Sequence, residues 1–230
     1  MTQGRSFIVP LWSAIFGSLA WISPFKLVGS LRPRSLQSPS FIDGWSLGHL
    51  ALALLTLVIA AIGAGWAGIF SLSLLAYGGV RLFELLVYQI NVLLFDEYRC
   101  RRDGKIYALH GYRRTVILLL HNYFEVLIWF AAAYILAERA GFVTIADGGV
   151  FGVLRQSLLF MVSFSGDIKG SGLGLFLILL QSGVGVLFTV VVLARFLSLL
   201  PTPATMDDAE TEAAAGAAVE PRVDTRRRNA

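Results

Sequence analysis

The sequence predicts an all-α membrane protein with four transmembrane helices and a re-entrant helix and loop between the third and the fourth. Hydrophobic residues make up 56% of the 230 residues and charged residues only 15%, whereas soluble domains carry about 25% charged residues. No charged residue lies between Asp43 and Arg81, and a second charge-free run covers residues 170–194. So little polar surface cannot cover a water-soluble domain, and the high hydrophobicity excludes disorder for most of the chain.

The first charge-free run is predicted to hold two helices. Residues 44–80 would form a single helix about 55 Å long, whereas the hydrocarbon core of a bilayer is about 30 Å thick. Glycines in the stretch 63–68 supply a turn between two helices. We therefore expect the first two spans near residues 46–64 and 67–90.

Two further spans and one shorter helix are expected in the second half of the chain. Residues 115–137 are apolar apart from three polar side chains, and the last apolar helix begins near Leu173 and ends near Leu200. Between them, the apolar stretch 149–164 has about 16 residues, which is short for a full crossing. This stretch fits a re-entrant or interfacial helix better.

The N-terminal stretch 7–25 is interpreted as a helix that lies in the membrane interface. It is uncharged, but Pro10 and Pro24 interrupt it, and it carries Trp12 and Trp21. Tryptophan favours the interface between lipid and water. A helix that crosses the membrane is the alternative for this stretch.

Basic residues predict the orientation. They concentrate in the loop between the second and the third span: Arg99, Arg101, Arg102, Lys105, Arg113 and Arg114. Loops rich in Lys and Arg stay on the cytoplasmic side, so four spans place both termini in the cytoplasm of a multi-pass protein of the cell (inner) membrane. The net charge of +4 thus marks orientation and contact with the lipid bilayer. We expect no nucleic-acid binding, because no basic stripe with interleaved aromatic residues is present.

The last third of the chain has the layout of a pore loop. A short apolar helix at 149–164 is followed by a loop of Gly, Ser and Asp at 165–172 and then by a full-length apolar helix. Irregular backbone at membrane depth must be buried in protein or line water. Its carbonyl oxygens can replace part of the hydration shell of an ion, and the C-terminal end of the short helix favours a cation.

Two stretches within residues 155–200 resemble the pore module of prokaryotic potassium-channel-like proteins. Ser157-Leu-Leu-Phe-Met-Val-Ser-Phe-Ser-Gly-Asp-Ile168 is similar to the pore helix and filter of that family. Gln181, Gly185-Val-Leu-Phe188 and Leu193-Ala-Arg195 are similar to its inner helix. The resemblance implies a homotetramer that conducts monovalent cations between four loops.

The filter sequence departs from the pattern of that family, which reads Thr-Val-Gly-Tyr-Gly-Asp. The corresponding positions here are Ser163, Phe164, Ser165, Gly166 and Asp167, which are one residue short and lack the Gly-Tyr-Gly core. Glycine permits backbone angles that Phe and Ser adopt poorly, so potassium selectivity is not carried over. The alternative is a non-conducting membrane scaffold or accessory subunit that retains the channel-like fold.

The resemblance and the membrane argument divide the chain into five parts. They are an N-terminal segment (1–43), a peripheral two-helix hairpin (44–97), a basic cytoplasmic loop (98–114), the pore-like module (115–200) and a disordered polar tail (201–230).

Several pore-module residues have a functional and a structural interpretation. Asp167 forms a ring of carboxylates at the pore mouth or caps its own loop. Gly183 and Gly185 form a hinge in the inner helix or permit close helix packing. Gln181 faces either the pore cavity or a neighbouring helix.

Three charged residues lie inside the spans. Arg81 and Glu84 are three residues apart on one helix face, and Glu125 lies in the third span. Because intramembrane charges are usually paired, we expect Arg81 to bind Glu84, Glu125 or both as a buried clamp. A voltage sensor is disfavoured because this span has a single arginine.

No enzyme activity, cofactor or metal is expected. His121 and Glu125 have the spacing of half a metal site, but no second pair supports it, and His49 is expected near a membrane edge. Cys100 is the single cysteine. The sequence lacks a nucleophile–base constellation and a phosphate-binding loop.

Overall fold

The structure is a computed structural model that describes residues 7–31, 38–63, 66–105 and 112–199. Residues up to Phe196 form one compact unit, and a second unit begins at Leu197. In chain order the elements are α1 (Ile8–Leu19), the short 3-10 helix η1 (Ala20–Ile22), α2 (Pro24–Leu31), α3 (Pro39–Ile62), α4 (Trp66–Ile90), the π-helical turn η3 (Asn91–Phe95), α5 (Asp96–Arg102), α6 (Tyr112–Arg139), β1 (Val143–Ile145), α7 (Gly149–Val162), β2 (Ile168–Gly170) and α8 (Leu173–Leu199).

Four helices are long and apolar enough to cross a membrane, which agrees with the expected multi-pass, all-α membrane protein. They cover Pro39–Ile62, Gly68–Arg102, Arg113–Arg139 and Leu173–Ala194. The predicted 201–230 tail lies outside the described residues.

The first span begins earlier than predicted. Pro39 occupies the first turn of α3, where the missing N–H of proline is tolerated and its fixed φ favours the helix. The helix ends at Ile62, and Gly63 follows in extended conformation. His49 consequently lies inside α3, ten residues after Pro39, and its expected place near a membrane edge stays a prediction.

The second span continues as helix well beyond residue 90. The π-helical turn η3 joins α4 to α5, so the helix continues to Arg102. Asn91 in this turn donates hydrogen bonds from Nδ2 to the carbonyl oxygens of Val87 and of Phe16 in α1, at 2.8 and 3.0 Å. The rings of Phe16 and Phe95 stack with centroids 5.8 Å apart. The π-helical turn thus binds the N-terminal helix.

The N-terminal stretch does not form one crossing helix. Its apolar helical part, Ile8–Ile22, is too short to span a bilayer. Ser23 is extended, and α2 begins at Pro24. This break agrees with the interfacial interpretation of residues 7–25.

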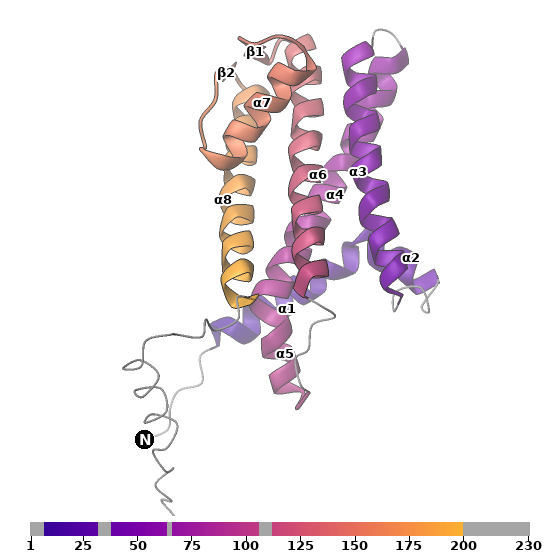
Figure 1. Ribbon diagram of the computed structural model, residues 1–230, viewed down its shortest axis with the longest axis vertical. Coiled ribbons are helices and arrows are strands. Elements are labelled where there is room, and N and C mark those ends of the chain that lie inside the picture. The colour runs from indigo at the N-terminus through magenta and orange to yellow at the C-terminus, as the bar shows by residue number, and fades with distance from the viewer. Residues whose placement is uncertain (1–6, 32–37, 64–65, 106–111, 200–230) are drawn as a thin grey trace, which may run out of the picture. The chain divides into compact units, whose positions relative to one another are not determined.

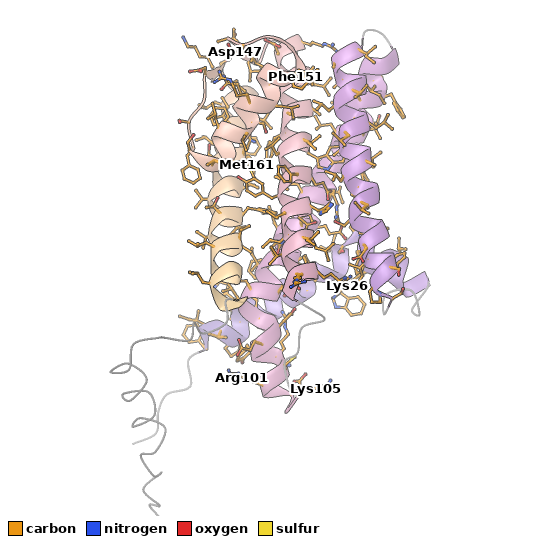
Figure 2. All side chains as sticks on the ribbon, viewed as in Figure 1. Lys26, Arg101, Lys105, Asp147, Phe151 and Met161 are labelled. Atoms are coloured by element: carbon orange, nitrogen blue, oxygen red, sulfur yellow. The ribbon has the colours of Figure 1, made fainter. Side chains whose placement is uncertain are left out.

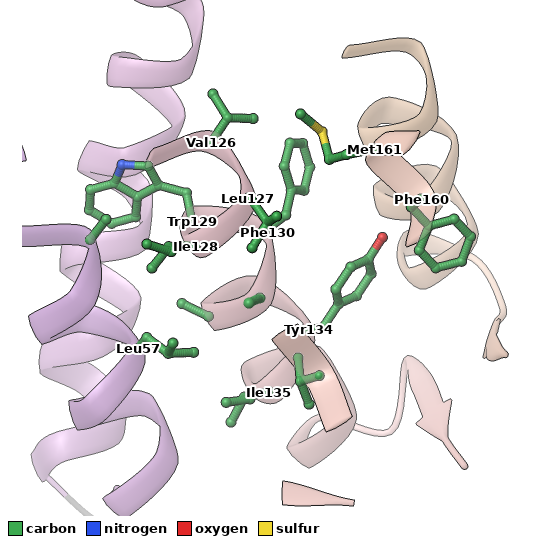
Figure 3. Packing of buried hydrophobic residues seen from close by; sticks show 14 of the residues in the cluster. Leu57, Val126, Leu127, Ile128, Trp129, Phe130, Tyr134, Ile135, Phe160 and Met161 are labelled. Carbon is green, nitrogen blue, oxygen red and sulfur yellow. The ribbon is translucent and has the colours of Figure 1, made fainter. Parts of the chain in front are cut away.

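Helix α6 is the centre of the core. It packs most extensively against α3 and also contacts α4 and α7. Figure 3 shows Trp129 on the side of α6 that faces α3 and α4, and Tyr134 on the side that faces Phe160 of α7. Gly78 of α4 lies against Trp129 so closely that an added Cβ atom would overlap the indole ring.

Two short strands, which the sequence reading did not predict, join the connections on either side of α7. β1 pairs antiparallel with β2, with Val143 opposite Gly170 and Ile145 opposite Ile168. The two ends of the α7 segment are therefore held together at one end of the bundle, and α7 lies beside α6 and α8 there (Figure 1).

Candidate pore loop and buried charge cluster

The entry into α7 depends on glycine. Gly141 adopts a positive φ of 75° directly after α6, and the N–H of Phe142 donates to the carbonyl oxygen of Ala137 at 2.9 Å. This is a Schellman-type end that turns the chain towards β1. Gly149 has a φ of 83° at the first residue of α7, a value that L side chains rarely adopt.

α7 approaches α8 closely at two positions of α8 that lie one helical turn apart. An added Cβ atom at Gly185 would lie 2.9 Å from both Cα and the carbonyl oxygen of Met161. Four residues earlier in α8, Gln181 Nε2 donates to Ser157 Oγ at 2.7 Å and to its carbonyl oxygen at 3.0 Å. Ser157 Oγ in turn donates to the carbonyl oxygen of Leu127 in α6 at 2.8 Å. These polar contacts tie three helices together at one level.

The three α8 residues selected from the sequence therefore have different surroundings. Gln181 is fully buried against α7, so of its two predicted positions it takes the one next to a neighbouring helix. Gly185 permits close helix packing, whereas nothing lies within 4 Å of a Cβ atom built on Gly183. A hinge at these glycines stays a prediction.

The loop after α7 is short and exposed. Ser163 Oγ donates to the carbonyl oxygen of Leu159 at 2.8 Å and lies 3.2 Å from Ser165 Oγ. Phe164 adopts a φ of 57°, the only positive value among the described non-glycine residues, and is 46% exposed. Phe164 thus takes the left-handed conformation that we expected it to adopt poorly, at a cost of about 1–2 kcal/mol.

Gln156 holds the second half of this loop. Its side-chain oxygen accepts a hydrogen bond from the backbone N–H of Asp167 at 2.8 Å, and its amide nitrogen lies 3.4 Å from Asp167 Oδ2. Gly166 allows this approach, because an added Cβ atom would lie 2.8 Å from Gln156 Oε1 and 2.9 Å from the ring of Phe160. Gln156 itself is fully buried.

Arg155 links two carboxylates beside the loop. It forms an ion pair with Asp147, and its NH2 lies 3.8 Å from Asp167 Oδ2. The side chains of Arg155 and Asp167 are 53% and 68% exposed. The carboxylate of Asp167 is therefore partly neutralised and accessible to solvent.

The intramembrane charges meet as predicted, and both expected pairs form. Arg81 NH1 lies 2.5 Å from Glu84 Oε2, and Arg81 Nε lies 2.9 Å from Glu125 Oε1. Arg81 NH2 also donates to Glu125 Oε2 at 3.2 Å, which makes this pair bidentate. We call Arg81, Glu84 and Glu125 the Arg81 cluster.

Neutral donors complete the Arg81 cluster. Glu84 Oε1 accepts hydrogen bonds from Ser23 Oγ and from the backbone N–H of Phe25, at 2.7 Å for the latter. Trp129 Nε1 lies 3.4 Å from Glu125 Oε1. The cluster therefore joins α4 and α6 to the turn between η1 and α2.

The histidines have separate surroundings. His49 contacts the carbonyl oxygen of Trp45 through Nδ1 at 2.7 Å and the hydroxyl of Tyr77 through Nε2 at 2.5 Å. His121 Nδ1 lies 2.8 Å from the carbonyl oxygen of Ile117 and makes no bond with Glu125. Within the described residues, no group of three or more potential metal ligands is present.

A cavity of about 130 Å³ adjoins the Arg81 cluster. Arg81 and Glu84 form part of its wall, and aromatic side chains, among them Phe25, Trp45 and Tyr88, form much of the rest. Trp45 Nε1 is buried without a hydrogen-bond partner in the described part of the chain.

The sequence predicts no functional role for two buried polar residues, Gln156 and His49. A polar amide in a short apolar helix signals a specific partner, and Gln156 carries that signal. His49 lies within the predicted first span, and no sequence pattern marks its partner Tyr77, which lies 28 residues later. Comparisons with protein-family models, with curated proteins and with solved structures find no match for this chain.

Proposed function

We propose that the chain is the subunit of a homotetrameric pore-loop cation channel in which the segment from α7 to β2 re-enters the membrane. The observation that carries the proposal is the exposed polar loop 163–167, which adjoins two apolar helices. If α8 spans a bilayer, this loop lies at membrane depth, where polar backbone must face protein or water. A ring of four copies around an aqueous axis satisfies that requirement.

Two contacts support re-entry. Met161, near the end of α7, lies against Gly185, which is twelve residues after the start of α8, or about 18 Å along the helix. The chain then returns, because β2 pairs with β1. Figure 2 places Asp147 and Phe151 near this end and Met161 farther along the bundle. These positions support a segment that enters and leaves the membrane on the same side.

Exposed apolar side chains support assembly with other copies. Phe151 of α7 is 88% exposed, and Phe176 and Leu179 of α8 are 62% and 61% exposed. Neighbouring copies would cover those near the loop, and lipid would cover the rest.

The chemistry of the loop supports cations with little discrimination. The hydroxyls of Ser163 and Ser165 bond to each other, and that of Ser163 also bonds to α7. Asp167 supplies a partly neutralised negative charge at the end of the loop. The chain lacks the regular glycine-supported carbonyl rings that replace a potassium hydration shell. We expect sodium and potassium to permeate comparably.

The basic residues support an orientation with both termini in the cytoplasm. Lys26, Arg101 and Lys105 lie at the end of the bundle opposite Asp147 (Figure 2). With Lys and Arg on the cytoplasmic side, the loop 163–167 opens towards the outside of the inner membrane.

The test is electrical recording from the purified full-length chain in planar bilayers, with potassium on one side and sodium on the other. We expect cation currents with a reversal potential near zero. Silence at all voltages contradicts conduction, and a strongly shifted reversal potential contradicts the expected lack of selectivity.

Phe164 favours a second candidate, a non-conducting scaffold. Its half-exposed ring lies in the middle of the loop, so four such rings around one axis would form an apolar plug. If the wild-type protein is silent and Phe164→Ala conducts, the plug is the cause. If both are silent although cross-linking shows tetramers, the scaffold function is favoured.

A further inference from the structure

The charges of the Arg81 cluster do not balance. Two carboxylates oppose one guanidinium, and the side chains of all three residues are at most 5% exposed. The remaining hydrogen-bond donors to the carboxylates, Ser23, Phe25 and Trp129, are neutral. A net negative charge inside a membrane-spanning bundle is strongly unfavourable, so the cluster lacks one positive charge.

His49 is placed to supply that charge. It is buried in α3, and its Nε2 contacts the hydroxyl of Tyr77, which lies about one helical turn before Arg81 in α4. Its Nδ1 faces a carbonyl oxygen, which only accepts hydrogen bonds, so Nδ1 carries a hydrogen in every state. The other nitrogen, Nε2, is therefore the atom that gains or loses a proton.

Both neighbours of the imidazole ring tolerate a positive charge. The hydroxyl of Tyr77, 2.5 Å from Nε2, can either donate or accept a hydrogen bond. The indole ring of Trp45 lies with its centroid 4.6 Å from that of His49, and an aromatic face attracts a cation.

We propose that His49 and the Arg81 cluster form a proton-binding site inside the bundle, which takes up one proton when the pH falls. A hydronium ion transfers its proton to the lone pair of His49 Nε2 and becomes water. The Tyr77 hydroxyl, which donates to the neutral imidazole, rotates and accepts from the imidazolium. The formal charges of His49, Arg81, Glu84 and Glu125 then sum to zero.

The charged and titratable groups that face this site come from three helices. Helix α3 contributes His49, α4 contributes Tyr77, Arg81 and Glu84, and α6 contributes Glu125. The turn between η1 and α2 contributes only the neutral donors Ser23 and Phe25 N. Two nearby charged residues are engaged elsewhere: Asp43 with Arg114, and Lys26 with the ring of Trp21.

The cavity of about 130 Å³ lies next to the site, although neither His49 nor Tyr77 lines it. Its wall includes Arg81, Glu84 and Trp45, and the buried indole N–H of Trp45 is available to a water molecule. Proton uptake would strengthen the attraction of α3 for α4 and α6, because His49 lies on the first helix and the carboxylates on the other two.

Trp45 provides a built-in reporter, since an imidazolium quenches the fluorescence of an adjacent indole. The experiment follows tryptophan fluorescence of the full-length protein in lipid nanodiscs from about pH 8 to about pH 5, the range in which histidine ordinarily titrates. We expect a one-proton transition that disappears in His49→Gln and loses most of its amplitude in Trp45→Phe. His121→Gln, a matched change at a partly exposed histidine of α6, leaves it unchanged.

Glu84→Gln tests the charge balance, because it removes one negative charge and keeps an oxygen that accepts from Ser23 and Phe25. The proton affinity of the site should fall on the order of tenfold. A transition that persists in His49→Gln, or the same midpoint in Glu84→Gln, overturns the proposal. A signal that follows sodium concentration at constant pH also overturns it, because a metal cation then supplies the charge.

Infrared difference spectra of the unmodified protein test the same site without a variant. Between about pH 8 and about pH 5.5 we expect imidazolium bands. A carboxylic-acid band from a buried group without imidazolium bands places the proton on Glu84 or Glu125 and overturns the assignment to His49. Neither readout involves ion conduction, so failure here leaves the channel proposal intact, and the reverse also holds.

Discussion

The side-chain oxygen of Gln156 accepts a hydrogen bond from the backbone N–H of Asp167, eleven residues later in the chain, at 2.8 Å. This single contact fixes the end of the exposed loop to the buried face of α7. It also determines where the carboxylate of Asp167 lies relative to Arg155.

Gln156→Leu should loosen the loop. The change keeps the buried volume and removes the acceptor, so the N–H of Asp167 loses its partner at a cost of about 1–3 kcal/mol. We expect faster hydrogen exchange in a peptide covering 163–168 and a lower melting temperature. Ser163→Ala, at an exposed position of the same loop, should change stability by less than about 0.5 kcal/mol. Equal hydrogen-exchange rates for residues 163–168 in both variants would contradict the role of the Gln156 side chain in holding the loop.

Gly185 and Gly183 of α8 are two positions at which the same substitution should have different effects. Gly185→Ala places a methyl group against the backbone of Met161 and forces α7 from α8, which should cost about 1–3 kcal/mol. Gly183→Ala meets nothing within 4 Å and should be neutral or slightly stabilising. Thermal unfolding in detergent measures both. A larger loss at Gly183 would mean that this face is covered in the assembled protein.

The adjacent glycines of α4 give a second matched pair. An added methyl group at Gly78 overlaps the ring of Trp129, whereas nothing lies near Gly79. Gly78→Ala should displace the indole, weaken its contact with Glu125 and lower stability by about 1–3 kcal/mol. Gly79→Ala should leave the unfolding temperature and the tryptophan emission maximum nearly unchanged. Similar emission spectra for the two variants would show that α4 and α6 pack differently.

Arg81→Ala should be among the most destabilising changes in the chain. It leaves Glu84 and Glu125 buried without their cation, and breaking a buried pair in this way typically costs about 3–5 kcal/mol. Arg114→Ala is the control, because its ion pair with Asp43 is partly exposed and worth about 0–1 kcal/mol. Chemical unfolding monitored by circular dichroism compares the two. A small effect at Arg81 would indicate that the cluster is hydrated.

If the chain conducts, Asp167 and Arg155 should act in opposite directions. Asp167→Asn removes a negative charge beside the loop and lowers cation conductance, and Arg155→Gln removes a positive charge and raises it. Because both side chains are more than half exposed, the two effects should shrink between about 0.1 M and about 1 M salt. Single-channel recordings of the wild type and both variants at the two salt concentrations measure these conductances. Conductance that is unchanged in both variants at low salt would remove Asp167 from the ion pathway.

The spans were predictable because a bilayer excludes charge. The absence of charged residues between Asp43 and Arg81 predicted two helices there. Because a charge inside the membrane must be neutralised, Arg81 was expected to pair with Glu84, Glu125 or both. The strands β1 and β2 were not predictable, because three residues each carry no periodic signal. The partner of Gln156 was equally hidden, because it is a backbone N–H that no sequence pattern marks.

Helix α6 packs against α4 on one face and against α7 on another. One face contributes Glu125 and Trp129 to the contacts with α4, and the other packs Tyr134 against Phe160 of α7. A fragment that begins at residue 112 would retain every residue of the pore-like module and still expose a carboxylate without its arginine. The peripheral hairpin is therefore an essential part of the same folding unit, and genetic transfer of the pore-like module to another protein should require α3 and α4 to accompany it.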